Sequence, residues 1–99
     1  MFTQGKRLNH SLIRMVICDC VSEGDPARVA FAAAKRLGNA VVRNRSKRVL
    51  REAARSCELP IEGHEIILFA TPRTRTASPE EMRLALLALL RRAHVVHNN

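Results

Sequence analysis

The chain has 99 residues, the size of one ordinary small domain, and 46% of them are apolar, which excludes a disordered tail. Lys and Arg number 17 against 9 Asp and Glu, so a partner that carries phosphate is the first expectation and an anionic membrane surface the second. No apolar run approaches the roughly 20 residues that a membrane-spanning helix needs.

The first third of the chain predicts two strands. Residues 1–11 are polar and basic, with Gly5 as a breaker and no secretory signal pattern. Residues 12–21 are rich in β-branched and apolar side chains and predict the first strand. A turn cluster at 22–26 follows, and residues 28–34 predict a second strand. Because the connection is short, we expect these two strands to form an antiparallel hairpin.

The cysteines are Cys18, Cys20 and Cys57. An odd number in a chain without an export signal indicates reduced thiols and a cytoplasmic location. Zinc sites usually use four ligands at a wider spacing than that of Cys18 and Cys20. We therefore interpret these residues as ordinary buried or half-buried cysteines.

Residues 35–55 carry the strongest pattern in the sequence. They hold eight of the seventeen basic residues against one acid, Glu52. Gly38 indicates a loop, and Asn39 is a suitable N-cap for a helix that runs from residue 39 or 40 to residue 56.

The last third predicts a strand and a packing helix. After a break at 60–64, residues 65–70 form the most apolar run and predict the third strand. A polar, basic loop at 71–77 leads to Ser78, Pro79 and Glu81, which together predict a capping box. An apolar stripe follows: Met82, Leu86, Leu89, Leu90 and Ala93. The fold class is α+β, a small two-layer sandwich with the order ββαβα.

On a helical wheel, the basic helix separates into two faces. One face can dock on a sheet: Val42, Ser46, Val49, Leu50, Ala53 and Cys57. The basic side chains Arg43, Lys47, Arg51 and Arg55 follow at i+4 steps along one edge, and Arg45 and Arg48 extend the arc. A solubilising helix mixes acidic and basic residues so that i,i+4 pairs attract each other. In this helix the i,i+4 pairs carry like charges, so they repel each other. Bound phosphates relieve such repulsion, so the pattern favours a polyanion.

The missing residue types narrow the choice of polyanion. Duplex DNA is read by base-edge side chains, and Asn44 is the only amide in the basic arc. Single-strand binders stack bases on aromatic rings, yet the chain has no Trp or Tyr. Phe31 lies on the predicted second strand, and the sequence leaves two orientations open for its ring: toward the core or toward a groove. Structured RNA, bound through its backbone and shape, fits best, with a slight preference over DNA.

Catalysis by the protein alone is not expected, because the chain has no phosphate-binding loop and no nucleophile elbow. The histidines are His10, His64, His94 and His97. The last two are spaced i, i+3, but no third ligand lies nearby, so we interpret them as tail residues and predict no protein metal site.

Residues 35–55 follow the pattern KRxGNAVxRNRxKRxxRExxR, which resembles the signature of the bacterial ribonuclease P protein subunit. A long, spaced motif around a central Arg-Asn-Arg is specific. The likeness extends more weakly over almost the whole chain. Gly5-Lys6-Arg7 resembles the basic turn before the first strand of the family, and residues 65–68 resemble its third strand.

The resemblance implies a role in transfer-RNA processing. Ribonuclease P is an endonuclease that removes the 5′ leader of precursor tRNA; its RNA subunit performs the hydrolysis with magnesium, and the small protein assists without a cofactor of its own. The implied partners are this catalytic RNA, one per protein monomer, and precursor tRNA, with no membrane. The residues implied to contact the catalytic RNA are Lys35, Arg36, Gly38, Asn39, Arg43, Asn44, Arg45, Lys47, Arg48, Arg51 and Arg55.

The resemblance also implies a second site and a particular fold. A cleft between the sheet and an N-terminal helix holds the single-stranded leader, with Phe31 and Ala33 at matching positions. The fold of the family is a small α/β sandwich with a left-handed βαβ crossover. Family members usually begin with a basic, aromatic-bearing helix, and this sequence starts at about the last residues of that helix. The resemblance therefore implies either that the sequence starts late or that this lineage has lost the helix.

Two alternatives from other classes stay open. One is a structural RNA-binding protein of ribosomal type with no role in tRNA maturation. The other is a DNA-binding regulator, which would prefer a particular duplex over folded RNA.

Overall fold

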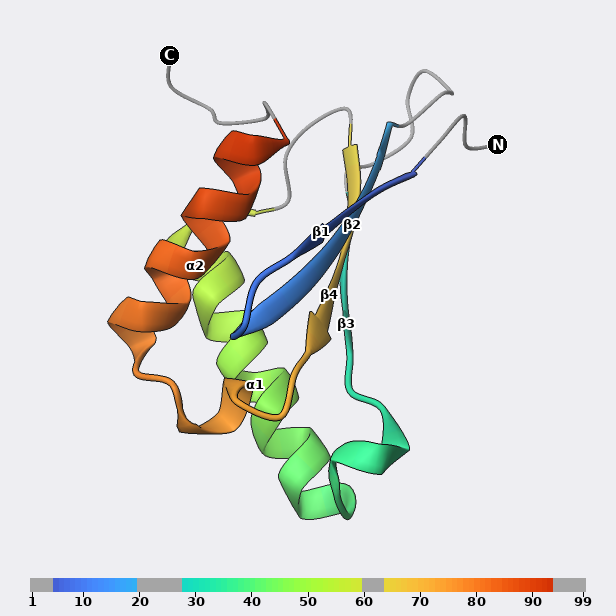
Figure 1. The fold of residues 1–99 in the computed structure, drawn as a ribbon, viewed down its shortest axis with the longest axis vertical. Helices are drawn as coiled ribbons and strands as arrows, with labels where there is room; N and C mark the ends of the chain where they lie inside the picture. Colours follow the sequence, from blue (N-terminus) through green and yellow to red (C-terminus); the bar gives the residue numbers. More distant parts are fainter. Residues whose placement is uncertain (1–4, 20–27, 60–63, 94–99) are drawn as a thin grey trace.

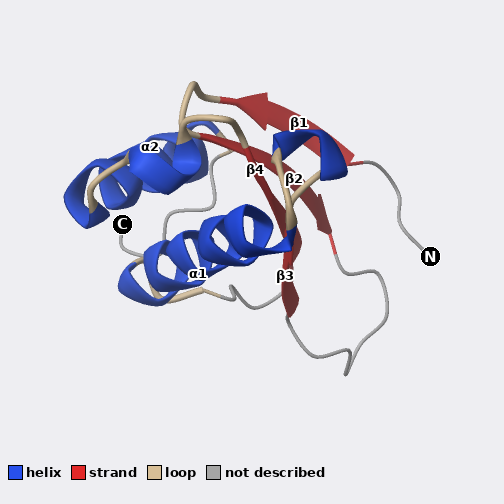
Figure 2. Ribbon diagram, turned by 90° about the horizontal axis from the view of Figure 1, so that it is seen from below, coloured by secondary structure: helices blue, strands red, loops and turns tan. Residues whose placement is uncertain are grey.

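The computed structural model describes residues 5–19, 28–59 and 64–93. Within these ranges one four-stranded sheet carries both long helices on the same face (Figures 1 and 2). The strands are β1 (Gly5–Asn9), β2 (Ile13–Asp19), β3 (Arg28–Ala32) and β4 (His64–Ala70), and the helices are α1 (Ala40–Ser56) and α2 (Pro79–Arg92). Two short 3-10 turns, η1 (Lys35–Leu37) and η2 (Thr74–Thr76), precede the helices. The α+β class is confirmed, as is the order ββαβα from Ile13 onward.

The predicted hairpin between the first two strands is wrong. The sheet order is β1-β2-β4-β3, so β2 pairs with β1 and β4, and β3 pairs only with β4. The β3–β4 pairing is parallel, from Arg28 opposite Glu65 to Ala32 opposite Phe69. β4 is the most apolar strand and takes a central position, where both edges are hydrogen-bonded. The alanine-rich β3 lies at an edge.

The first strand was not predicted from the sequence. Gly5, Lys6 and Arg7, expected in a turn, begin β1, which pairs antiparallel with β2. A polar edge strand with Leu8 as its one apolar residue gives no clear alternation, so tertiary pairing decides its conformation. A tight turn closes the hairpin: the His10 amide donates to the Ile13 carbonyl at 2.9 Å.

Parallel strands β3 and β4 are joined through α1, which forms the expected βαβ unit. In Figure 1 both strands run from the top of the view to the bottom, so in Figure 2, seen from below, they run toward the reader and the path from β3 through α1 to β4 turns clockwise. The crossover is therefore left-handed, the uncommon hand.

The core lies between the sheet and the two helices. Alternate residues of β2 and β4 point to the helices and are buried, among them Ile13, Met15 and Leu68. The predicted stripe of α2 is buried against them, and the capping box is confirmed: Ser78 accepts from the Glu81 amide at 3.1 Å and Glu81 accepts from the Ser78 amide at 2.9 Å. Among the described residues, no helix combines the length and the apolar character needed to cross a membrane.

Candidate nucleic-acid interface

The entry to α1 depends on one glycine. Gly38 has φ 143° and ψ −164°, a region that is essentially restricted to glycine. A Cβ at this position would lie 3.1 Å from the Cβ of Val42, on the first turn of α1. Asn39 then caps the helix, because its Oδ1 accepts from the Val42 amide at 3.1 Å. These two residues fix the angle between η1, which carries Lys35 and Arg36, and α1.

The two faces predicted for α1 are confirmed by its burial. Ser46, Leu50, Ala53 and Cys57 are buried, and Val42 and Val49 are half-buried. The side of α1 that faces solvent is basic: Asn44, Arg45, Arg48, Arg51 and Arg55 are exposed, and Arg43 and Lys47 are half-buried at its margin. In the described part of the chain, none of these cations forms an ion pair. We call this set the α1 basic face.

One edge of the α1 basic face packs beside β3. The Arg51 guanidinium carbon lies 5.6 Å from the centre of the Phe31 ring, within the range of a cation–π contact. Phe31 is opposite Leu68 in the β3–β4 register, so both side chains point to the helix layer. Phe31 and Ala33 are half-buried and pack against the core. The core-facing orientation left open by the sequence is therefore the one that Phe31 adopts.

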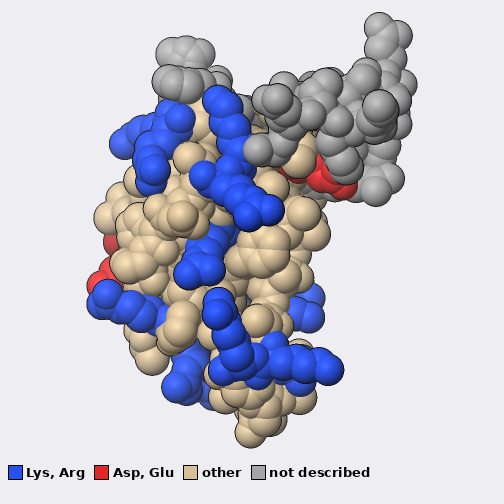
Figure 3. All heavy atoms as spheres, turned by 45° about the vertical axis from the view of Figure 1, so that its right-hand side comes forward, with Lys and Arg blue, Asp and Glu red and all other residues tan. Residues whose placement is uncertain are grey.

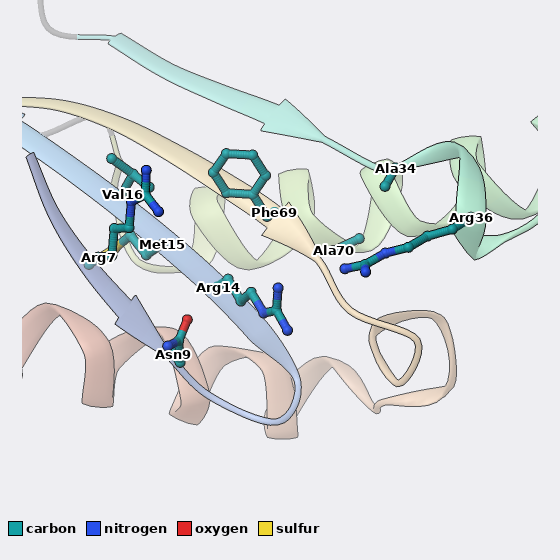
Figure 4. Close-up of a pocket in the computed structure, with 9 residues that line it drawn as sticks. All are labelled: Arg7, Asn9, Arg14, Met15, Val16, Ala34, Arg36, Phe69 and Ala70. Atoms are coloured by element: carbon teal, nitrogen blue, oxygen red, sulfur yellow. The ribbon is translucent and has the colours of Figure 1, made fainter.

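The opposite face of the sheet is not covered by the described helices, and it holds a pocket of about 540 Å³. Its lining includes three arginines, Arg7, Arg14 and Arg36, and the ring of Phe69 (Figure 4). Lys and Arg side chains run along this side of the molecule in the space-filling view (Figure 3). Arg14 lies opposite Phe69 in the register, which places both on this open face. Sequence reasoning missed Arg7, Arg14 and Phe69, because only the register reveals that they share a face.

The remaining candidates from the sequence do not form a site. Cys57 is buried at the end of α1, and burial raises the pKa of its thiol. Cys18 is half-buried on β2, and both are free thiols. Cys20, His94 and His97 lie outside the described residues. Within 5–19, 28–59 and 64–93, no three His, Cys, Asp or Glu side chains come close enough to hold a metal ion.

Comparison with protein families identifies one whose members resemble this chain. The family model described as Ribonuclease P matches residues 1–94. The ribonuclease P protein component of Alkaliphilus metalliredigens is 30% identical over 97 residues, which is 97% of this chain and 86% of that protein. The component of Gluconacetobacter diazotrophicus is 47% identical over 55 residues, which is 54% of this chain and 47% of that relative, so the chain matches about half of its length.

Comparison with solved structures finds the same fold. The ribonuclease P protein of Staphylococcus aureus superposes with a TM-score of 0.72 and 23% identity. The superposition covers 94% of this chain and 84% of that one. At this identity the likeness shows the fold alone.

Proposed function

Because the chain belongs to the bacterial family of ribonuclease P protein components, we propose that it binds the catalytic RNA of that enzyme and assists removal of the 5′ leader from precursor tRNA. The RNA subunit performs the hydrolysis, and the protein is the accessory subunit. The α1 basic face and η1 form the contact with the catalytic RNA. This proposal includes all the residues of the 35–55 motif named from the sequence.

The observation that carries the proposal is a cationic helix face without compensating charge. Six Lys and Arg residues lie on α1 against Glu52 alone, and none of them is ion-paired within the described ranges. Phosphates would relieve this repulsion and release counterions. Arginine supplies five of the six, and its planar guanidinium binds phosphate through two parallel hydrogen bonds.

A single-stranded leader fits the open face of the sheet better than the helix side of β3. The open-face pocket combines three arginines with the Phe69 ring, and a ring that stacks on bases beside cations that contact phosphates is typical of single-strand binding. Phe31 instead lies under Arg51, on the helix side. In this proposal Phe31 and Ala33 support the edge of the cleft, and the pocket residues contact the leader.

The proposal extends to the remaining partners and conditions. One monomer binds one catalytic RNA, and the magnesium that the hydrolysis needs is held by the RNA. The free thiols Cys18 and Cys57 support a reducing compartment, so we place the protein in the cytoplasm.

Cleavage of a precursor tRNA by the cognate RNA, with and without the protein, tests this function. At a magnesium concentration too low for the RNA alone, we expect the protein to restore cleavage, and the protein without RNA to cleave nothing. The Arg45→Ala/Arg48→Ala variant should restore less, because phosphate contacts are lost. Unchanged cleavage on addition of the protein would refute the proposal, and co-sedimentation with ribosomal subunits would then favour a ribosomal-type protein.

A further inference from the structure

A second basic element lies outside the 35–55 motif, in the segment between β4 and α2. Its 3-10 turn η2 (Thr74–Thr76) packs against α1. Arg73 and Arg75 are exposed at this turn and form no ion pair within the described ranges. The turn is drawn in orange beside α1 in Figure 1. The family-like motif does not include these two arginines.

The segment is held rigidly by two buried threonines. Thr74 is fully buried, and its hydroxyl donates to the Leu12 carbonyl at 2.6 Å while accepting from the Thr71 amide at 2.8 Å. The Thr71 hydroxyl donates to the Ser11 carbonyl at 2.8 Å and accepts from the Arg73 amide at 3.2 Å. These bonds tie the segment to the β1–β2 turn. A satisfied buried network of this kind fixes one backbone conformation.

The position of η2 relative to α1 follows from the groove between the two helices. Val49, Glu52 and Ser56 of α1 line this groove together with Ala77, which follows η2, and Pro79, the first residue of α2. Arg45 lies four residues before Val49, so it is one turn earlier on the same edge of α1. The η2 arginines therefore flank the α1 basic face on the edge of Arg45, whereas β3 and Phe31 flank the edge of Arg51.

We infer that Arg73 and Arg75 form a second phosphate-binding element. This element contacts the catalytic RNA next to the part of the RNA that the α1 basic face binds. The inference rests on the proposed function. Two exposed arginines without carboxylate partners match the phosphate backbone in charge, and η2 continues the α1 basic face. The threonine network holds the arginines in place before the RNA binds, so less conformational entropy is lost on binding.

Binding of the full-length protein to the cognate catalytic RNA, measured against salt concentration, tests the inference. From the salt dependence of phosphate contacts, each lost contact weakens binding about four- to fivefold at 0.15 M salt and reduces the slope of log affinity against log salt by roughly 0.7–0.9. We expect this loss for Arg73→Ala and for Arg75→Ala. The matched control is Arg91→Ala, which removes the same charge about 18 Å along α2 from Pro79 and should change affinity less than about twofold.

Two further variants separate positioning from charge. Thr74→Val keeps both arginines but removes the hydroxyl that fixes them, and we expect weaker RNA binding, while Thr74→Ser should restore it. Circular dichroism melts identify any variant that fails to fold.

The outcomes distinguish the two proposals. If Arg48→Ala weakens binding but Arg75→Ala matches Arg91→Ala, the η2 contact is refuted and the proposed function stands. If neither Arg48→Ala nor Arg75→Ala has an effect, the proposed function fails as well. If Arg75→Ala changes only the binding of precursor tRNA to the assembled holoenzyme, the contact with the catalytic RNA is refuted.

Discussion

Replacement of Gly38 by alanine should destabilise the fold through two separable effects. At φ 143° an L-residue is strained, and such conformations cost about 1–3 kcal/mol. In addition, the new Cβ would lie 3.1, 3.2 and 3.3 Å from three side-chain atoms of Val42, so α1 must shift by a few tenths of an ångström or its first turn must loosen. A loss of about 2 kcal/mol would lower Tm by roughly 8–16 °C in a domain of this size.

Thermal and urea denaturation of Gly38→Ala, Val42→Ala and the double variant measure each effect. In the double variant the close contacts with the Cγ atoms are relieved while the backbone strain remains, so we expect it to lose less stability than the sum of the two single variants. RNA binding by Gly38→Ala should also weaken, because Lys35 and Arg36 change their orientation relative to α1. A Gly38→Ala protein with the stability of the parent would refute the role given to the backbone at Gly38.

Three further predictions concern stability. Asn39→Ala should cost about 1 kcal/mol in urea unfolding, because the Val42 amide loses its acceptor, whereas Asn39→Asp should retain the cap; equal stability of all three proteins would contradict the capping role. Leu50→Ala should cost about 2–5 kcal/mol, since Leu50 of α1 is fully buried in the core, and a loss below 1 kcal/mol would show that α1 is loosely docked. The pKa of the Cys57 thiol is raised above its ordinary value of 9.0 by burial, so the unfolded chain releases this proton first and stability should fall as pH rises above about 9. The Cys57→Ala variant should lack this part of the alkaline loss in urea titrations at pH 8 and pH 10, and an identical loss in both proteins would exclude Cys57 as its source.

Local signals in the sequence were sufficient for the helices. Asn39 and Ser78 cap through contacts within three residues, so the residue types alone define where α1 and α2 begin. The docking face of α1 follows from the 3.6-residue period, and the basic face is what remains. The arrangement of the α1 residues in a buried face and a basic face could therefore be predicted almost completely.

The sheet could not be predicted in the same way, because pairing between strands is non-local. Nothing in the sequence of β3 states that it pairs with β4, about 35 residues later, in preference to β2. The open face depends on that pairing: Arg7 on β1, Arg14 on β2 and Phe69 on β4 meet only once the register is set. The side taken by Phe31 has the same cause, since its partner Leu68 belongs to the core.

The buried threonines show a second limit. In the sequence, Thr71 and Thr74 belong to an ordinary polar loop. In the structure they are buried, because their hydroxyl groups donate hydrogen bonds to the carbonyls of Ser11 and Leu12 across the fold. A polar residue is buried where a partner exists, and that partner is about 60 positions away in the sequence. From the sequence alone, Arg73 and Arg75 could therefore not be distinguished from ordinary solvent-exposed charges.

The salt dependence of binding to the catalytic RNA tests most directly whether the α1 basic face is the RNA contact. Arg45→Ala and Arg48→Ala should each weaken binding and reduce the slope of log affinity against log salt by roughly 0.7–0.9, because one phosphate contact and its released counterion are lost. Arg91→Ala, with the same change in net charge, should leave the slope unchanged. Slopes for Arg45→Ala and Arg48→Ala equal to that of the parent protein would place α1 outside the interface.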